Sequence, residues 1–277
     1  NPGGDGTEPL EKAASYLEQS LNSPVYEQNE ELDTGIRLKL ADTYSKLYSK
    51  SGNMEYQERV VNIYGDLLSI YDAGVAPAEH YKTKSAMADA LLSLADSSGD
   101  GDKLERAASC YDECLGYFTR ENSPEEWIGL SEKLGNAYVQ LALKDENDQE
   151  KESLLRKSIN VLTAVSEELK KGEDIERLAG VMKSLGFAYG EMALYEDRAE
   201  CVEREIECYS EALGYYSADK DSEHYADCQT SLGNAYKNKS ELQIDAEACI
   251  LAIECYEKAL TVCDISSRPD DYAMVQN

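Results

Sequence analysis

The stretch "LGNAY" occupies residues 232–236 of this 277-residue chain, and the same five letters stand at residues 134–138. A third copy, "LGFAY" at residues 185–189, differs only in its central residue. The starts of the three copies are separated by 51 and 47 residues. Degenerate copies start 47 and 94 residues before the "LGNAY" copy at 134–138, at Met87 ("MADAL") and Leu40 ("LADTY"). A shared interval of this kind indicates a tandem repeat.

A column of large residues repeats in step with this motif. Its members are separated by 48, 47, 51, 47 and 47 residues: Tyr16, Tyr64, Tyr111, Leu162, Tyr209 and Tyr256. Three prolines also keep their place, each preceding an aromatic residue or histidine by three: Pro77 before His80, Pro124 before Trp127 and Pro269 before Tyr272. Independent columns with one period make the repeat a firm prediction.

Each repeat is predicted to hold two helices. Apolar residues recur at helical spacing around both columns, as in Ile250, Ile253 and Leu260. Polar segments such as 144–149 and 217–223 separate the helices, and no alternating pattern indicates strands. We call the helix with the "LGNAY" motif the first helix and the helix with the large-residue column the second helix.

The predicted fold is therefore all-α, a solenoid of antiparallel helix pairs with motifs near residues 40, 87, 134, 185 and 232. About five full pairs are expected, with a half repeat at each end. One half is an unpaired second helix at about 9–21, and the other is the start of a sixth first helix at Asp270. Residues 1–8 are expected to form a flexible lead-in to a solenoid over 9–277, and the chain is expected to be a fragment of a longer protein.

These repeats resemble the tetratricopeptide repeat family, whose pattern is Leu-Gly-x-x-Tyr, then Ala-x-x-x-aromatic, then Pro. Leu232, Gly233 and Tyr236 match the first part, and Ala252 and Tyr256 match the second. The resemblance covers roughly residues 9–277, with a period 13 residues longer than in the family and no Trp three residues before the Leu. It is similar to kinesin light-chain-like repeats with long helices. The resemblance implies a right-handed superhelical solenoid whose first helices line a concave, peptide-binding groove.

The motif itself is explained by packing. Leu232 and Tyr236 lie one helical turn apart and are expected to fill the space between paired helices. Gly233 costs helix stability, so its recurrence predicts a close approach of the partner helix, with Ala41 and Ala88 in the same column.

The charge of the chain restricts its partners. Asp and Glu total 55 against 27 Lys and Arg, which gives a net charge of −28. Such a surface repels nucleic-acid phosphates and anionic lipid headgroups. We therefore expect a protein or peptide partner, no nucleic acid and no membrane surface. No stretch approaches the roughly 18 apolar residues of a membrane span.

The eight cysteines are predicted to be buried and to pack as apolar residues. Cys110, Cys208 and Cys255 share a repeat column with Ile63 and Val161. No C-x-x-C pair is present, so a zinc site is not expected. Free buried thiols favour a reducing, cytoplasmic location.

Catalysis has no sequence support. His80 and His224 lack the partners of a triad or metal site. No Gly-rich phosphate loop, G-x-S-x-G or H-E-x-x-H is present. The acidic run at 200–207 is interpreted as a solvated helix face. We expect no enzyme activity, no cofactor and no metal.

The candidate binding residues lie on the first helices. The central position of the repeated motif is expected to face the groove, where an amide can donate to and accept from a peptide backbone. This column holds Asn136, Asn234, Asp42, Asp89 and Phe187. A solvent-exposed helix position that merely tolerates Asn would explain this column equally well.

Lysines are the second candidate feature. Lys133, Lys183 and Lys237 lie on first helices, whereas the second helices are rich in Glu, so the groove is expected to be less negative than the back. The family's two-carboxylate clamp for chaperone tails needs a Lys and an Asn one turn apart. Here Lys183 precedes Phe187 and Glu132 precedes Asn136, which argues against that ligand.

The predicted function is a non-catalytic protein–protein interaction scaffold that binds a peptide or helix in its groove. Two alternatives stay open. One is a structural spacer or self-association module that stacks through open repeat ends, and the other is a regulatory arm of a catalytic domain outside this chain.

Overall fold

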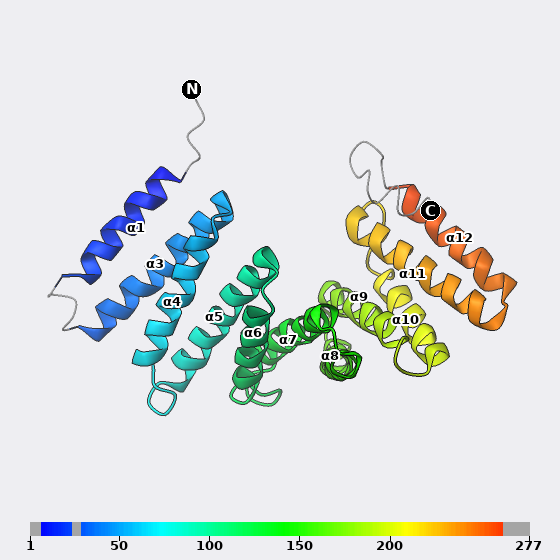
Figure 1. Ribbon diagram of the computed structural model, residues 1–277, viewed down its shortest axis with the longest axis horizontal. Coiled ribbons are helices and arrows are strands. Elements are labelled where there is room, and N and C mark those ends of the chain that lie inside the picture. The colour runs from blue at the N-terminus through cyan, green and yellow to red at the C-terminus, as the bar shows by residue number, and fades with distance from the viewer. Residues whose placement is uncertain (1–6, 24–28, 263–277) are drawn as a thin grey trace, which may run out of the picture. The chain divides into compact units, whose positions relative to one another are not determined.

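The computed structural model describes residues 7–23 and 29–262, and all regular structure in these ranges is α-helical (Figure 1). Within each of the two compact units described below, successive helices pack as antiparallel neighbours in a tandem-repeat arrangement, which confirms the predicted fold class. The helices are α1 (Glu8–Leu21), α3 (Glu30–Ser51), α4 (Met54–Ile70), α5 (Pro77–Ser98), α6 (Gly101–Leu115), α7 (Pro124–Lys144), α8 (Asp148–Leu169), α9 (Ile175–Met192), α10 (Arg198–Ala212), α11 (Ser222–Gln243) and α12 (Ala246–Leu260).

The first helices of the repeats are α3, α5, α7, α9 and α11, and the second helices are α1, α4, α6, α8, α10 and α12. The unpaired second helix expected at 9–21 is α1. The sixth first helix expected from Asp270 lies outside the described residues, as does most of the expected lead-in. The chain divides into two compact units, with residues up to Leu130 in the first and residues from Ser131 in the second.

Helix starts follow the capping signals of the sequence. Pro77 and Pro124 are the first residues of α5 and α7, where the missing proline N–H is not needed. Asp100, Asp197 and Asp245 cap second helices. Each side chain accepts hydrogen bonds from backbone N–H groups of the first turn, as from Glu247 N to Asp245 Oδ1 at 2.9 Å.

Helix ends differ between repeats. The turns after α3 and α5 contain Gly52 and Gly99, with φ of 67° and 72°. The corresponding turn after α11 contains Ile244, with φ of 52° and a side chain that is 94% exposed. Because a β-branched residue is disfavoured in the left-handed region, Ile244 introduces strain that glycine avoids.

The close approach predicted at the motif glycines is confirmed. A Cβ added to Gly233 would lie 2.5 Å from the ring of Tyr256, and one added to Gly186 would lie 3.0 Å from the ring of Tyr209. At Gly135 the obstructing side chain is Leu162, at 2.6 Å. In these three pairs the motif glycine of the first helix therefore packs directly on the large-residue column of the second.

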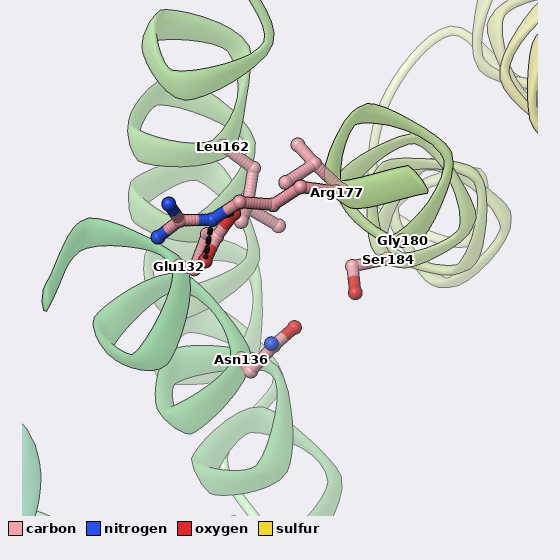
Figure 2. Close-up of a pocket in the computed structure, with 7 residues that line it drawn as sticks. Glu132, Asn136, Leu162, Arg177, Gly180 and Ser184 are labelled. Atoms are coloured by element: carbon pink, nitrogen blue, oxygen red, sulfur yellow. Dashed lines mark hydrogen bonds and ion pairs between the residues drawn. The ribbon is translucent and has the colours of Figure 1, made fainter. Parts of the chain in front are cut away.

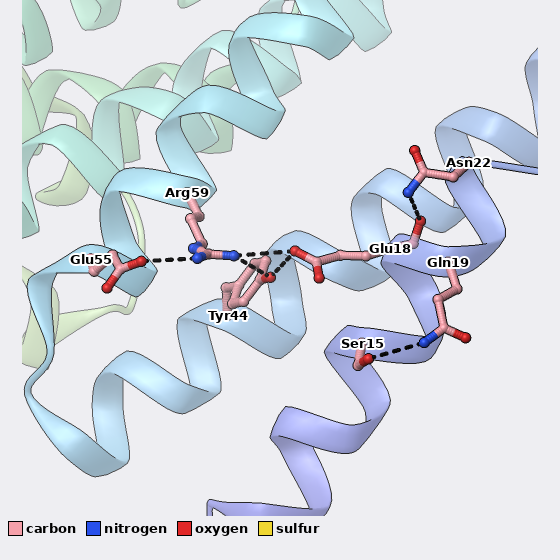
Figure 3. Close-up of polar contacts among 7 residues, drawn as sticks. All are labelled: Ser15, Glu18, Gln19, Asn22, Tyr44, Glu55 and Arg59. Atoms are coloured by element: carbon pink, nitrogen blue, oxygen red, sulfur yellow. Dashed lines mark hydrogen bonds and ion pairs between the residues drawn. The ribbon is translucent and has the colours of Figure 1, made fainter.

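Polar contacts fix α1 against the first pair (Figure 3). Arg59 on α4 donates to the Glu18 carboxylate of α1 at 3.2 Å and to the Tyr44 hydroxyl of α3 at 3.0 Å. The Tyr44 hydroxyl in turn donates to Glu18. Arg59 also pairs with Glu55 one turn away, at 2.9 Å. One guanidinium thus ties three helices together.

Within 7–23 and 29–262, no helix is both long and apolar enough to cross a membrane. Most described cysteines are buried and free, as expected, and burial raises the pKa of Cys114, Cys208 and Cys228 to about 12. Cys249 departs from this expectation because it is exposed. Cys263 lies outside the described residues.

Candidate functional site

A cavity of about 240 Å³ lies in the second unit where α7, α8 and α9 meet (Figure 2). It lies between two consecutive first helices, α7 and α9, and the second helix α8 contributes Leu162. Its lining residues are Glu132, Asn136, Leu162, Arg177, Gly180, Val181 and Ser184.

An ion pair closes one end of the cavity. The Arg177 Nε on α9 donates to both carboxylate oxygens of Glu132 on α7, at 2.8 and 2.9 Å. Both side chains are largely buried, with 28% and 20% exposed. Burial raises the pKa of Glu132, and the hydrogen bond and charge of Arg177 oppose that rise. The pair therefore links two repeats and leaves little net charge at this end of the cavity.

The remaining walls combine an apolar floor with neutral polar groups. Leu162 and Val181 are buried and form the apolar part. Asn136 extends from α7 into the space between α7 and α9, and Ser184 lies across from it on α9 (Figure 2). An amide and a hydroxyl together offer donors and acceptors without charge. This arrangement suits a peptide backbone or an amide side chain.

The residues at the central position of the motif make different contacts in different repeats. Asn136 lines the cavity, whereas Asn234 accepts a hydrogen bond from the Tyr256 hydroxyl at 2.8 Å. Asp89, in the first unit, accepts one from the Tyr111 hydroxyl at 2.7 Å. These bonds connect the motif to the large-residue column of the same pair. Asp42, also in the first unit, pairs with Lys46 one turn away at 2.6 Å.

The other predicted residues are spread along the first helices. Lys183 on α9 pairs with Asp227 on α11 at 2.9 Å, so it joins two consecutive first helices. Phe187 on α9 is 40% exposed. Lys133 is half-buried on α7, and Lys237 is exposed on α11. Only Asn136 of the predicted set lines the cavity.

Sequence reasoning missed Arg177 and Ser184. The sequence did contain a signal. The position two residues before the motif leucine holds a charged residue in both helices, Glu132 in α7 and Lys183 in α9. Each of these residues pairs with an oppositely charged residue on the next first helix, Arg177 and Asp227 respectively.

A basic column on the second helices was missed as well. Arg59 lies over the ring of Tyr44 and Lys157 over the ring of Tyr138, at 5.4 and 5.7 Å from the ring centroids. Both basic residues stand five positions before the large-residue column. Two of the helix pairs therefore include a cation–π contact between their helices.

The interpretation of the acidic run at 200–207 as a solvated helix face is wrong for Glu205. Glu200 and Glu207 are exposed, but Glu205 is only 7% exposed and packs against Gly190 of α9. Its Oε2 atom has no hydrogen-bond partner among the residues that the structure describes. Burial, and then the nearby charge of Glu191, raises the pKa of Glu205 to about 7. Glu205 occupies the column of Val60, Ala107, Ser158 and Ala252, which the helical pattern alone would have marked as buried.

Comparison with known proteins adds a description at the level of architecture. No protein-family model and no curated protein matches the chain. A similar solved structure is a circular tandem repeat protein with novel repeat topology and enhanced subunit contact surfaces, at 16% identity and a TM-score of 0.35. The match covers 92% of this chain and spans about 65% of the length of that protein. On its own helix order and packing, the chain is an all-helical tandem-repeat protein.

Proposed function

We propose that the chain is a non-catalytic protein–protein interaction scaffold of the long-helix tetratricopeptide type. In this proposal its helix pairs wind as a right-handed solenoid, and a partner peptide or helix binds in the groove lined by the first helices. The observation that carries the proposal is the cavity between α7 and α9, where Asn136 and Ser184 stand above a floor formed by Leu162 and Val181.

The cavity favours a neutral peptide segment. A backbone amide or a Gln or Asn side chain can both donate to and accept from Asn136 and Ser184. Because the charge of Glu132 is balanced by Arg177, a ligand at this site needs no charge of its own.

The same features support a binding role over catalysis. The charged groups of the cavity are bonded to each other, and the described residues that line it include no histidine, cysteine or lysine that could act as a base or nucleophile.

The test is selection of peptides from a displayed random library on the intact chain, followed by affinity measurements with variants. We expect Asn136→Ala combined with Ser184→Ala to weaken selected peptides by about tenfold or more, as two lost hydrogen bonds would. Asn160→Ala, an exposed amide on α8, is the matched control and should change nothing. Equal affinity of the double variant and the native chain would refute the cavity as the binding site.

A further inference from the structure

The outer face of α12 carries an exposed apolar stripe. Ile250 and Ile253 are 58% and 52% exposed, and Cys249 beside them is exposed as well. These three residues and Ala246 fall on one face of the helix, because they recur at intervals of three and four residues. We call this face the α12 stripe.

Two positions of the stripe are covered in other repeats. Cys249 stands seven residues before the large-residue column, where the other pairs bury Gln57, Leu104, Leu155 and Val202. Ile253 stands three residues before it, in the column of Val61, Ala108, Ile159 and Ile206, all of them at least half-buried. In α4 and α10 the following first helix packs against the second helix. A helix laid on α12 would cover these positions in the same way.

Ile250 occupies a column whose residues differ between repeats. This column, six residues before the large-residue column, holds charged residues in four second helices: Glu58, Glu105, Arg156 and Glu203. In α1 it holds Leu10, which packs against the core of the first pair. An apolar residue at this position, such as Ile250, is therefore one that a packed helix can cover.

Charge identifies the kind of occupant. Glu247, Glu254 and Glu257 are exposed along the stripe, and the one exposed basic residue of this helix, Lys258, stands at its end, so the border of the stripe is acidic on balance. A second copy of the chain would bring the same acidic border, with a net charge of −28 of its own. An amphipathic helix with an apolar stripe and basic flanks is complementary in both respects.

We propose that the α12 stripe is a docking surface for a basic amphipathic helix supplied by a partner protein. Ile250 and Ile253 form its apolar centre, and Glu247, Glu254 and Glu257 pair with the basic flank. This surface is separate from the cavity between α7 and α9, so the two proposals stand or fall independently.

The first experiment separates docking from simple attraction between charges. The probe is a synthetic amphipathic Leu/Lys helix, compared with a scrambled peptide of equal composition. The variant Ile250→Glu introduces the residue type found at this position in α4, α6 and α10 and adds negative charge. Docking predicts that this variant weakens binding of the helix by about tenfold, since apolar burial is lost. Stronger or unchanged binding, or equal binding of the scrambled peptide, would overturn the proposal. Ile175→Glu alters an exposed isoleucine of α9 and is the control.

The second experiment uses Cys249 as a reporter. In the full chain with Cys263→Ser, a maleimide should label Cys249 rapidly because Cys249 is exposed. Buried cysteines such as Cys114 and Cys228 should react slowly, since they are shielded and burial raises their pKa. We expect the Leu/Lys helix to slow this labelling and the scrambled peptide not to. Protection in the free chain at every concentration would show that the chain itself covers the stripe. Protection that grows with protein concentration would identify a second copy. Either result would overturn the proposal.

Discussion

The first helices of the two compact units make different ion pairs. In the first unit, Arg37 pairs with Asp66 at 2.7 Å and Lys84 with Glu113 at 2.5 Å, and each ion pair joins the two helices of one pair. In the second unit, Glu132 pairs with Arg177 and Lys183 with Asp227, and each ion pair joins one repeat to the next.

The packing columns differ as well. The first unit places Ala41 and Ala88 where the second unit places Gly135, Gly186 and Gly233. The repeated apolar columns thus determine which helices pack together, whereas the charged residues determine which neighbouring helices are joined by ion pairs. Four substitutions test this division, in order of decreasing effect.

Removal of the large-residue column should cost more in the first unit than at the end of the second. Tyr111 is fully buried and donates to Asp89, so Tyr111→Ala should lower the free energy of unfolding by about 3–5 kcal/mol. Tyr256 is partly exposed, and Tyr256→Ala should cost clearly less. Urea unfolding followed by circular dichroism measures both. Equal losses would mean that the column contributes alike in the two units.

The buried carboxyl of Glu205 should make stability depend on pH. Its pKa rises from 4.5 to about 7 on folding, so its stabilising contribution is complete below about 4.5 and is lost as the pH rises through 7. Glu205→Gln should raise the free energy of unfolding by about 2–3 kcal/mol in mildly alkaline buffer and flatten that pH dependence.

The matched control for Glu205 is Glu200→Gln, an exposed change on the same helix. It should leave the slope of stability against pH as in the native chain. If the stability of Glu205→Gln depended on pH as steeply as that of the native chain, another titratable group would be the cause. Because the first unit has Val60 and Ala107 in this column, this titration belongs to the second unit.

The glycine column can be tested by an added methyl group. Gly233→Ala gains helix propensity but brings the Cβ to 2.5 Å from the Tyr256 ring, so a net loss of about 1–2 kcal/mol is expected. Gly65→Ala on α4 has nothing within 4 Å of the added Cβ and should gain up to about 1 kcal/mol. Thermal and urea unfolding compare them. A gain at both positions would show that Tyr256 moves aside without cost.

The turn after α11 should yield the smallest effect. Ile244→Gly relieves the positive φ of 52° and gives this turn the residue found at Gly52 and Gly99. Part of the gain is offset by the greater freedom of glycine in the unfolded chain, so about 0.5–1 kcal/mol of stabilisation is expected. Val75→Gly, an exposed apolar change in the loop before α5, is the comparison and should not stabilise. A destabilised Ile244→Gly variant would show that the Ile244 side chain makes a stabilising contact.

The sequence predicts the helices and their close contacts because packing repeats with the period. Gly233 and Tyr256 belong to columns that any pair must bring together. The side-chain pairs do not repeat in the same way. Asn136 and Asn234 share a column, yet one lines a cavity and the other binds Tyr256.

Glu205 escaped prediction for a related reason. The residue type of Glu205 predicts exposure to solvent, whereas its position in the helical pattern predicts burial in the core. The structure shows that Glu205 is buried. The cavity itself depends on the distance between α7 and α9, which no single column specifies. It was therefore not predictable from the repeat.

The charges on the first helices also determine the order in which repeats follow one another. The helix α9 presents two basic residues, Arg177 and Lys183, and its acidic partners Glu132 and Asp227 lie on α7 before it and on α11 after it. If α11 were to stack on α7 in its place, Glu132 would lose Arg177 and would lie against the helix that carries Asp227. Since the apolar columns are nearly alike in every repeat, they cannot distinguish a correct neighbour from a skipped one. Alternating charge does, and it thereby disfavours misassembled arrays in which a repeat is left out.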